Sequence, residues 1–200
     1  MKSVVCFLTL CTVPISAFNP SVTIKKDYQA VRPPLSKECL AHRSAVVAGV
    51  SIKMASHTKG LGAFAKYPIK FGTYVGEYSG EAMTLDEVLA RFWGKREKDA
   101  ADKMWSKSRH YRGQSESGDY LLEVTDGTFV DAEDGDVSTW TRFMNHASEE
   151  TGACNVRPFM QTEIGGATHK YPRFFAMRDI RAGEELCWDY GEFYTEKSFD

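Results

Sequence analysis

The sequence lacks several features that would assign it to a specialised class of protein. It has only five cysteines in 200 residues, and none of them forms a Cys-x-x-Cys pair. A disulfide framework is therefore not expected, and a complete zinc site would have too few thiols. No apolar run is long enough to span a bilayer. The formal net charge is only −2, so no strong overall field would attract nucleic acid or an anionic membrane.

The chain does have enough apolar sequence for one folded domain. Hydrophobic residues make up 42% of it, which suits a single globular domain with a core of its own. We expect this domain to span residues 45–195, with residues 196–200 as a short tail. A basic partner would have to be held by a local acidic surface, because the chain as a whole carries little net charge.

The N-terminus has the layout of a targeting segment. One lysine precedes an uncharged, mostly apolar run from Val4 to Val13, and small residues follow at Ser16 and Ala17. This order predicts a signal-like presequence, residues 1–17, cleaved after Ala17. The stretch "ISAFNP" also resembles the junction of bipartite presequences in algae with secondary plastids. We expect a secretory or plastid destination; a buried first strand or a misassigned start codon, with a nuclear location, is the alternative.

Periodicity predicts a β-rich domain with one helical insert. Residues 18–44 contain three prolines and little periodicity, which is typical of a linker or transit segment. Thr84 and Glu87 have the spacing of a capping box at the start of a helix, and beyond Gly94 we expect a charged helix or an ordered loop. Asp126-Gly127 is a hairpin signal. The strand-like patterns lie in residues 44–55, 57–80, 119–132 and 173–191.

Two glycine-containing stretches are candidates for ligand contact. In "KGLGAFA", residues 59–65, two glycines around one residue would let the backbone approach a ligand closely, although an isolated pair is better explained by a strand turn. In "YVGEYSGE", residues 74–81, tyrosines and glycines share one face of a strand. Such a face could line a slot, or the tyrosines could be purely structural.

Two further stretches combine polar and aromatic residues. "RFMNHASEETGACN", residues 142–155, places an Asn-His pair and a second asparagine after an apolar run. Buried groups of this kind need hydrogen-bond partners, which suggests a polar ligand. A metal site at His146 and Cys154 would lack its other ligands, so we expect no metal. "EELCWDYGEFYTEKSFD", residues 184–200, is rich in aromatics where chain ends are usually polar.

In this order and spacing, "KGLG", "GEYSGE", "RFMNH" and "RDIRAGEELCWDYG" resemble the SET-domain protein lysine methyltransferases. The resemblance covers roughly residues 46–194. It implies a mainly β SET-domain fold of small curved β-sheets plus the helical insert. It also implies a pseudoknot, in which the C-terminal segment threads beneath a preceding loop.

The resemblance also implies S-adenosyl-L-methionine as cofactor and a lysine channel that enters from the opposite face. Either Tyr194 or Phe193 would cover the adenine. The implied catalytic residues of the channel are Tyr78, Tyr120, Trp188 and Tyr190. The implied cofactor-binding residues are Lys59, Gly60, Leu61, Gly62, Tyr120, Arg142, Asn145, His146, Tyr190 and Tyr194.

The expected reaction is methyl transfer to a substrate protein or peptide with an exposed lysine, a histone tail being one candidate. The amine must first lose its proton, which a dry aromatic channel beside a sulfonium favours. Tyr190 is best interpreted as an orienting and electrostatic group. Three departures from the family pattern leave the substrate class open: no cysteine follows Gly191, no Cys-rich segment precedes the domain, and the loop after His146 is long. The rival hypothesis is a catalytically silent SET domain that binds proteins.

Overall fold

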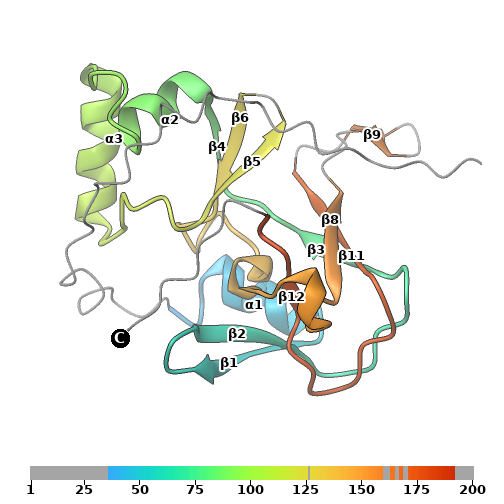
Figure 1. Ribbon diagram of the computed structural model, residues 1–200. Coiled ribbons are helices and arrows are strands. Elements are labelled where there is room, and N and C mark those ends of the chain that lie inside the picture. The colour runs from blue at the N-terminus through green and yellow to red at the C-terminus, as the bar shows by residue number, and fades with distance from the viewer. Residues whose placement is uncertain (1–35, 126, 160–162, 165–166, 169–170, 192–200) are drawn as a thin grey trace, which may run out of the picture. The chain divides into compact units, whose positions relative to one another are not determined.

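A computed structural model describes residues 36–125, 127–159, 163–164, 167–168 and 171–191 (Figure 1). All of them belong to one unit of the chain, Pro33–Asp200. The expected presequence 1–17, most of the segment 18–44 and the tail 196–200 lie outside the described residues. No helix in the described part is long and apolar enough to cross a membrane.

The described chain begins with a helix where the sequence predicts a linker followed by a strand. Helix α1 (Leu40–Val47) buries Ala41 and Ala45 and packs against strand β1 (Val50–Ser56) and the 3-10 helix η3 (Trp140–Phe143). The strand prediction is wrong for residues 44–47. Ala41 and Ala45 are four residues apart and so share one face of a helix, and this face, rather than the β-branched Val46 and Val47, is buried. The helix begins inside the segment expected to be a linker.

The remaining regular structure consists mainly of small antiparallel sheets, which confirms the mainly β prediction. The β1–β2 hairpin pairs Val50 with Ala65. A three-stranded sheet has the order β3-β11-β8 and another the order β4-β6-β5 (Figure 1). The predicted hairpin is confirmed, because β5 and β6 pair and Gly127 between them has a φ of 72°; Asp126 lies outside the described residues. The strands are β1 (Val50–Ser56), β2 (Gly60–Ala65), β3 (Tyr74–Glu77), β4 (Glu81–Thr84), β5 (Leu121–Thr125), β6 (Thr128–Asp131), β8 (Val156–Phe159), β9 (Glu163–Ile164), β10 (Ala167–Thr168) and β11 (Arg173–Ala176).

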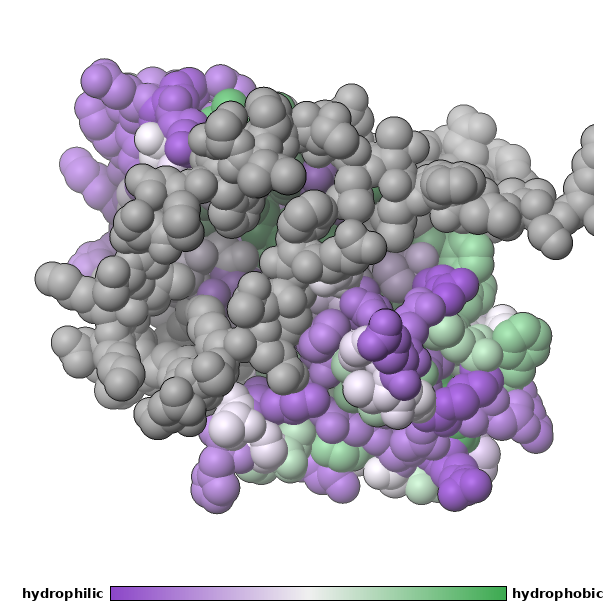
Figure 2. Space-filling view, in the orientation of Figure 1, coloured by the Kyte–Doolittle hydropathy of each residue, from purple (hydrophilic) through white to green (hydrophobic). Residues whose placement is uncertain are grey.

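The helical insert consists of α2 (Leu85–Arg91) and α3 (Ala100–Tyr111). The predicted capping box of Thr84 and Glu87 is confirmed. Buried Arg109 of α3 binds Asp131 of β6 and the carbonyl of Ser115, while Trp105 Nε1 donates to Glu81 of β4 at 2.8 Å. These contacts fix the insert to the β4-β6-β5 sheet, and the outer side of α3 is hydrophilic (Figure 2).

The last described strand passes between two ends of one loop. Strand β12 (Cys187–Trp188) pairs in parallel with β7 (Asn145–His146), which follows η3 (Trp140–Phe143). On its other edge the carbonyl of Cys187 accepts from Asn155 N at 3.0 Å. Residues 147–154, with the 3-10 helix η4 (Glu149–Thr151), therefore bridge over β12. This is the knot-like threading that the sequence resemblance predicts.

Candidate active site

Three aromatic side chains from two distant segments form one wall. The ring centroid of Trp188 lies 4.5 Å from that of Tyr190 and 6.5 Å from that of Tyr78. The Tyr190 hydroxyl donates to the carbonyl of Met144 at 2.5 Å, and the Tyr78 hydroxyl donates to the carbonyl of Tyr120 at 2.9 Å. The fold thus brings together the four residues that the resemblance assigns to the channel.

Burial determines the chemistry of this wall. Tyr78 is buried, and burial together with the neighbouring Tyr190 raises its pKa well above the usual value. Its hydroxyl therefore stays protonated and acts as a donor. Trp188 is only 5% exposed, and its Nε1–H has no hydrogen-bond partner among the described residues. An unpartnered buried donor costs about 1–3 kcal/mol, so a ligand atom or water that accepts this N–H would recover part of that cost.

The Asn-His pair lies beside the wall because β7 pairs with β12. Asn145 Nδ2 donates to the carbonyl of Leu61 at 3.2 Å and to Glu185 Oε1 at 2.7 Å. The carbonyl of His146 accepts from Lys59 Nζ at 3.1 Å. Residues 59–62 and the Asn-His pair, far apart in the sequence, are therefore neighbours in space.

His146 connects this polar group to the aromatic wall. Its Nδ1 accepts from the backbone N–H of Tyr190 at 3.2 Å, and the two rings meet edge to face with centroids 5.4 Å apart. A shift of His146 would therefore move Tyr190 as well.

The glycine pair has the close backbone approach that its sequence indicates. Gly60 has a φ of 72°, which favours glycine. A Cβ on Gly62 would lie 2.5 Å from Glu185 Oε1, 2.9 Å from the Ala55 Cβ and 3.0 Å from Asn145 Nδ2. A side chain at position 62 would therefore force the Asn145–Glu185 pair to shift.

A family model for the SET domain matches residues 60–191 of this chain. The chain belongs to the SET-domain family. Its knot-like β12 and the grouping of all four motifs around that strand agree with this assignment.

Three similar proteins illustrate the family. The chain is 34% identical over 157 residues to the histone-lysine N-methyltransferase EZH2 of Chaetomium thermophilum, covering 75% of this chain and 8% of that protein. It is 30% identical over 134 residues to the probable inactive histone-lysine N-methyltransferase SUVR1 of Arabidopsis thaliana, covering 66% of this chain and 16% of that protein. A structure of autoinhibited ctPRC2 bound to S-adenosylmethionine aligns with a TM-score of 0.47 at 28% identity, covering 72% of this chain and 15% of that one. The chain thus spans a small part of each.

Arg142 has protein partners in this SET domain. The resemblance implies that it holds polar parts of the cofactor, but its side chain is buried and its Nε and Nη2 donate to the carbonyls of Ala132 and Glu133 at 2.7 and 3.0 Å. The guanidinium also lies 4.1 Å from the centre of the Tyr120 ring. These contacts place Arg142 as a brace between Tyr120 and the residues after β6.

Sequence reasoning missed two components of the site. The first is the carbonyl of Met144, which accepts from Tyr190; backbone groups leave no residue-type signal. The second is Glu185, which binds Asn145. Its signal in the sequence is the Glu-Glu pair before the last strand, to which sequence reasoning assigns no role. The adenine-covering candidates Tyr194 and Phe193 lie outside the described residues.

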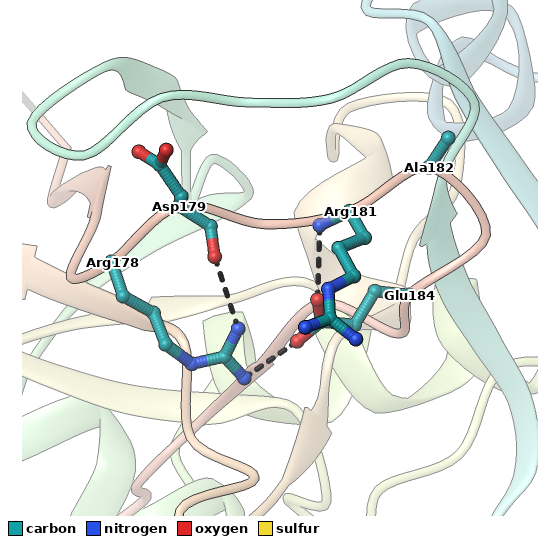
Figure 3. Close-up of a pocket in the computed structure, with 5 residues that line it drawn as sticks. All are labelled: Arg178, Asp179, Arg181, Ala182 and Glu184. Carbon is teal, nitrogen blue, oxygen red and sulfur yellow. Dashed lines mark hydrogen bonds and ion pairs between the residues drawn. The ribbon is translucent and has the colours of Figure 1, made fainter.

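Glu184, the neighbour of Glu185, is held on the far side of the same segment. Figure 3 shows Arg178 reaching toward Glu184, and their closest atoms are 2.5 Å apart. The backbone N–H of Arg181 donates to Glu184 Oε2 at 3.0 Å. Glu184 also accepts from Asn155 Nδ2 at 3.2 Å. This carboxylate therefore braces the loop end at Asn155.

The two cysteines near the knot are packed as apolar residues. Cys154 and Cys187 are buried together with Ala147, against Met177. Burial raises the pKa of Cys154, and it raises that of Cys187 to about 12. Both thiols are therefore protonated at neutral pH, and thiolate is the form that binds metal and reacts.

Proposed function

We propose that this protein is an S-adenosylmethionine-dependent protein-lysine N-methyltransferase. The observation that carries the proposal is that β12 joins two half-sites. On one side Trp188 and Tyr190 complete an aromatic wall with Tyr78. On the other, β12 pairs with β7 and so places Asn145 against Leu61. An aromatic wall next to a polar backbone cradle suits the alignment of an amine with a methyl donor.

The residues of the polar half fit the cofactor. When bound, S-adenosylmethionine would supply a methyl group on a positively charged sulfur. Asn145 offers Oδ1, which accepts no hydrogen bond from the described residues, to an N–H donor of the ligand. The bare backbone at Gly60, where no atom lies within 4 Å of the position that a Cβ would take, lets a ligand approach closely.

The aromatic half fits a lysine side chain. Lysine has a pKa near 10.4 in water, and an apolar wall disfavours its charged form. Tyr78 remains protonated because burial raises its pKa, so it orients the substrate rather than accepting its proton. The Tyr190 hydroxyl donates to the carbonyl of Met144, which orients the phenol, and its oxygen would be the group that contacts the methyl group.

The substrate in this proposal is a protein or peptide with an exposed lysine. The two named relatives are described as histone-lysine methyltransferases, one of them probably inactive, which supports a histone tail as the first substrate to test. The signal-like residues 1–17 support a non-histone substrate in a secretory or plastid compartment instead. A fluorescent reporter fused to residues 1–45 distinguishes these two substrate classes. Nuclear fluorescence would reject the secretory or plastid location.

A silent, protein-binding SET domain is the alternative, because one relative is described as probably inactive. Against it, Tyr78 and Tyr190 keep their hydroxyl bonds to backbone carbonyls. Automethylation measured by mass spectrometry separates the two. A protein that binds S-adenosylmethionine but methylates neither itself nor any protein in a cell extract would be the silent form.

The decisive test combines binding with transfer. Calorimetry should show micromolar-range S-adenosylmethionine binding without added metal. Tyr190→Phe should keep binding and lose most transfer to a histone octamer or peptide. Tyr171→Phe is the matched control, since its hydroxyl also donates to a backbone carbonyl, that of Gly80 at 3.1 Å, outside the wall. Wild-type protein that binds no S-adenosylmethionine would overturn the proposal.

A further inference from the structure

We infer that Glu185 is a positioning residue, whose carboxylate sets the orientation of the Asn145 carboxamide so that Oδ1 faces the cofactor. This inference rests on the proposed function. The central contact is the hydrogen bond of 2.7 Å from Asn145 Nδ2 to Glu185 Oε1.

The chemistry of the contacts fixes which way the amide points. Asn145 Nδ2 has two hydrogens, and both are used, one on the Leu61 carbonyl and one on Glu185. Both of these neighbours can only accept a hydrogen bond. A flipped amide would bring its oxygen against two acceptors, one of them charged. The carboxylate thus excludes the flipped orientation.

The second asparagine of the loop shows the contrast. Asn155 is fully buried, and its Nδ2 donates to Glu184 Oε1 and to the carbonyl of Glu185, at 3.2 and 2.7 Å. Its Oδ1 accepts from the backbone N–H of Cys187 at 3.0 Å. Protein groups therefore satisfy the whole Asn155 amide. Asn145 keeps one acceptor for a ligand, so the consecutive glutamates hold two asparagines for different purposes.

The backbone around Glu185 makes its position precise. Glu185 forms an antiparallel bridge with Phe64, and Leu186 N donates to the carbonyl of Ala63 at 2.7 Å. Its carboxylate occupies the space that a side chain at position 62 would need. The β2 strand thus fixes the backbone that carries Glu185, and Gly62 makes room for its carboxylate.

The experiment measures S-adenosylmethionine affinity by calorimetry and thermal unfolding for the full chain and its variants. Glu185→Ala should weaken binding about tenfold or more, because the amide can flip. Glu185→Gln keeps a carbonyl oxygen for Asn145 and should stay within about threefold of wild type. Glu184→Gln, the matched control, should lower the melting temperature and leave affinity within about threefold.

Each result has a definite meaning. If Glu185→Gln binds as weakly as Glu185→Ala, the negative charge rather than amide orientation matters, and the inference is wrong. An unchanged affinity in a folded Glu185→Ala protein also overturns it. If Glu185→Ala does not fold, Glu185→Asp replaces it. This variant keeps the charge but withdraws the carboxylate by one methylene, and should weaken binding about tenfold. Wild-type affinity in Glu185→Asp would overturn the inference. Absence of binding in the wild type would instead reject the proposed function and, with it, this role.

Discussion

Under the proposed function, we expect Trp188 to determine how many methyl groups are added to the substrate lysine. The resemblance to the SET family implies that this position often holds phenylalanine or tyrosine, and that a tyrosine hydroxyl there can hold a water against the lysine nitrogen. Trp188 is 5% exposed and its ring lies 4.5 Å from that of Tyr190, centroid to centroid. It is therefore in the wall as well as in the core. We expect it to behave like phenylalanine and allow di- or trimethyl products, because an indole N–H can donate but not accept.

The magnitude follows from one hydrogen bond. A hydroxyl introduced by Trp188→Tyr would add an interaction of about 0.5–1.5 kcal/mol. At 1.4 kcal/mol for each factor of ten, the rate of the second methyl transfer relative to the first should fall roughly two- to tenfold. The opposing effect is bulk, since the indole is larger than a phenyl ring. We expect the missing hydroxyl to matter more than the bulk. The indole ring can rotate within the wall to make room, but it cannot gain a hydrogen-bond acceptor.

Mass spectrometry of a methylated peptide tests this. Wild type should give di- or trimethyl-lysine over long incubation, and Trp188→Tyr should shift the products toward monomethyl-lysine. Trp188→Phe is the control and should give the same products as wild type. Monomethyl product alone from the wild type would refute the reasoning. It would mean that bulk, or a water held on the unpartnered Nε1–H, stops the reaction after one transfer.

Three further predictions concern stability and processing. Arg109→Met should lower the free energy of unfolding by about 3–5 kcal/mol in urea, because it strands a buried carboxylate; a loss below about 1 kcal/mol would contradict this. A hydrogen bond from Arg91 lowers the pKa of Asp102 to about 2. Burial alone would raise the pKa of Glu184, but hydrogen bonds from Arg178 and from the backbone of Arg181 outweigh burial and lower it to about 2. Both pKa values lie below the unfolded values near 4. The two carboxylates should therefore contribute fully to the free energy of unfolding above about pH 5 and lose this contribution as the pH falls toward 2. A free energy of unfolding that denaturant titration finds unchanged over this pH range would contradict the prediction. N-terminal sequencing of protein from cells should find Phe18 or a later residue first, and an intact initiator methionine would reject the signal.

Local patterns predicted the parts of the fold that local physics determines. The Thr84 capping box and the Gly127 turn depend on neighbours within a few residues, and both are confirmed. Helix α1 was missed because only Ala41 and Ala45 mark its buried face, and the β-branched valines at its end favour a strand. The pattern was too short to distinguish a helix from a strand, and tertiary packing against β1 and η3 determines the helix.

The site could be predicted by residue type but not by contact. The Asn-His pair was identified because polar groups after an apolar run would need hydrogen-bond partners if buried, and the tyrosines were assigned through the resemblance to the SET family. Arg142 was assigned to the cofactor, whereas its guanidinium binds the carbonyls of Ala132 and Glu133. Glu185 was not assigned at all. The contacts of Arg142 and Glu185 each involve a partner that only folding brings close, and no local sequence pattern encodes such a contact.

The threading of β12 explains why the two half-sites form together. Its backbone is bonded on both edges, to Ala147 N through the carbonyl of Trp188 and to Asn155 N through that of Cys187. The aromatic wall and the partner of Asn145 both come from this segment. A loose C-terminal strand would therefore disrupt the aromatic wall and the Asn145–Glu185 contact at once.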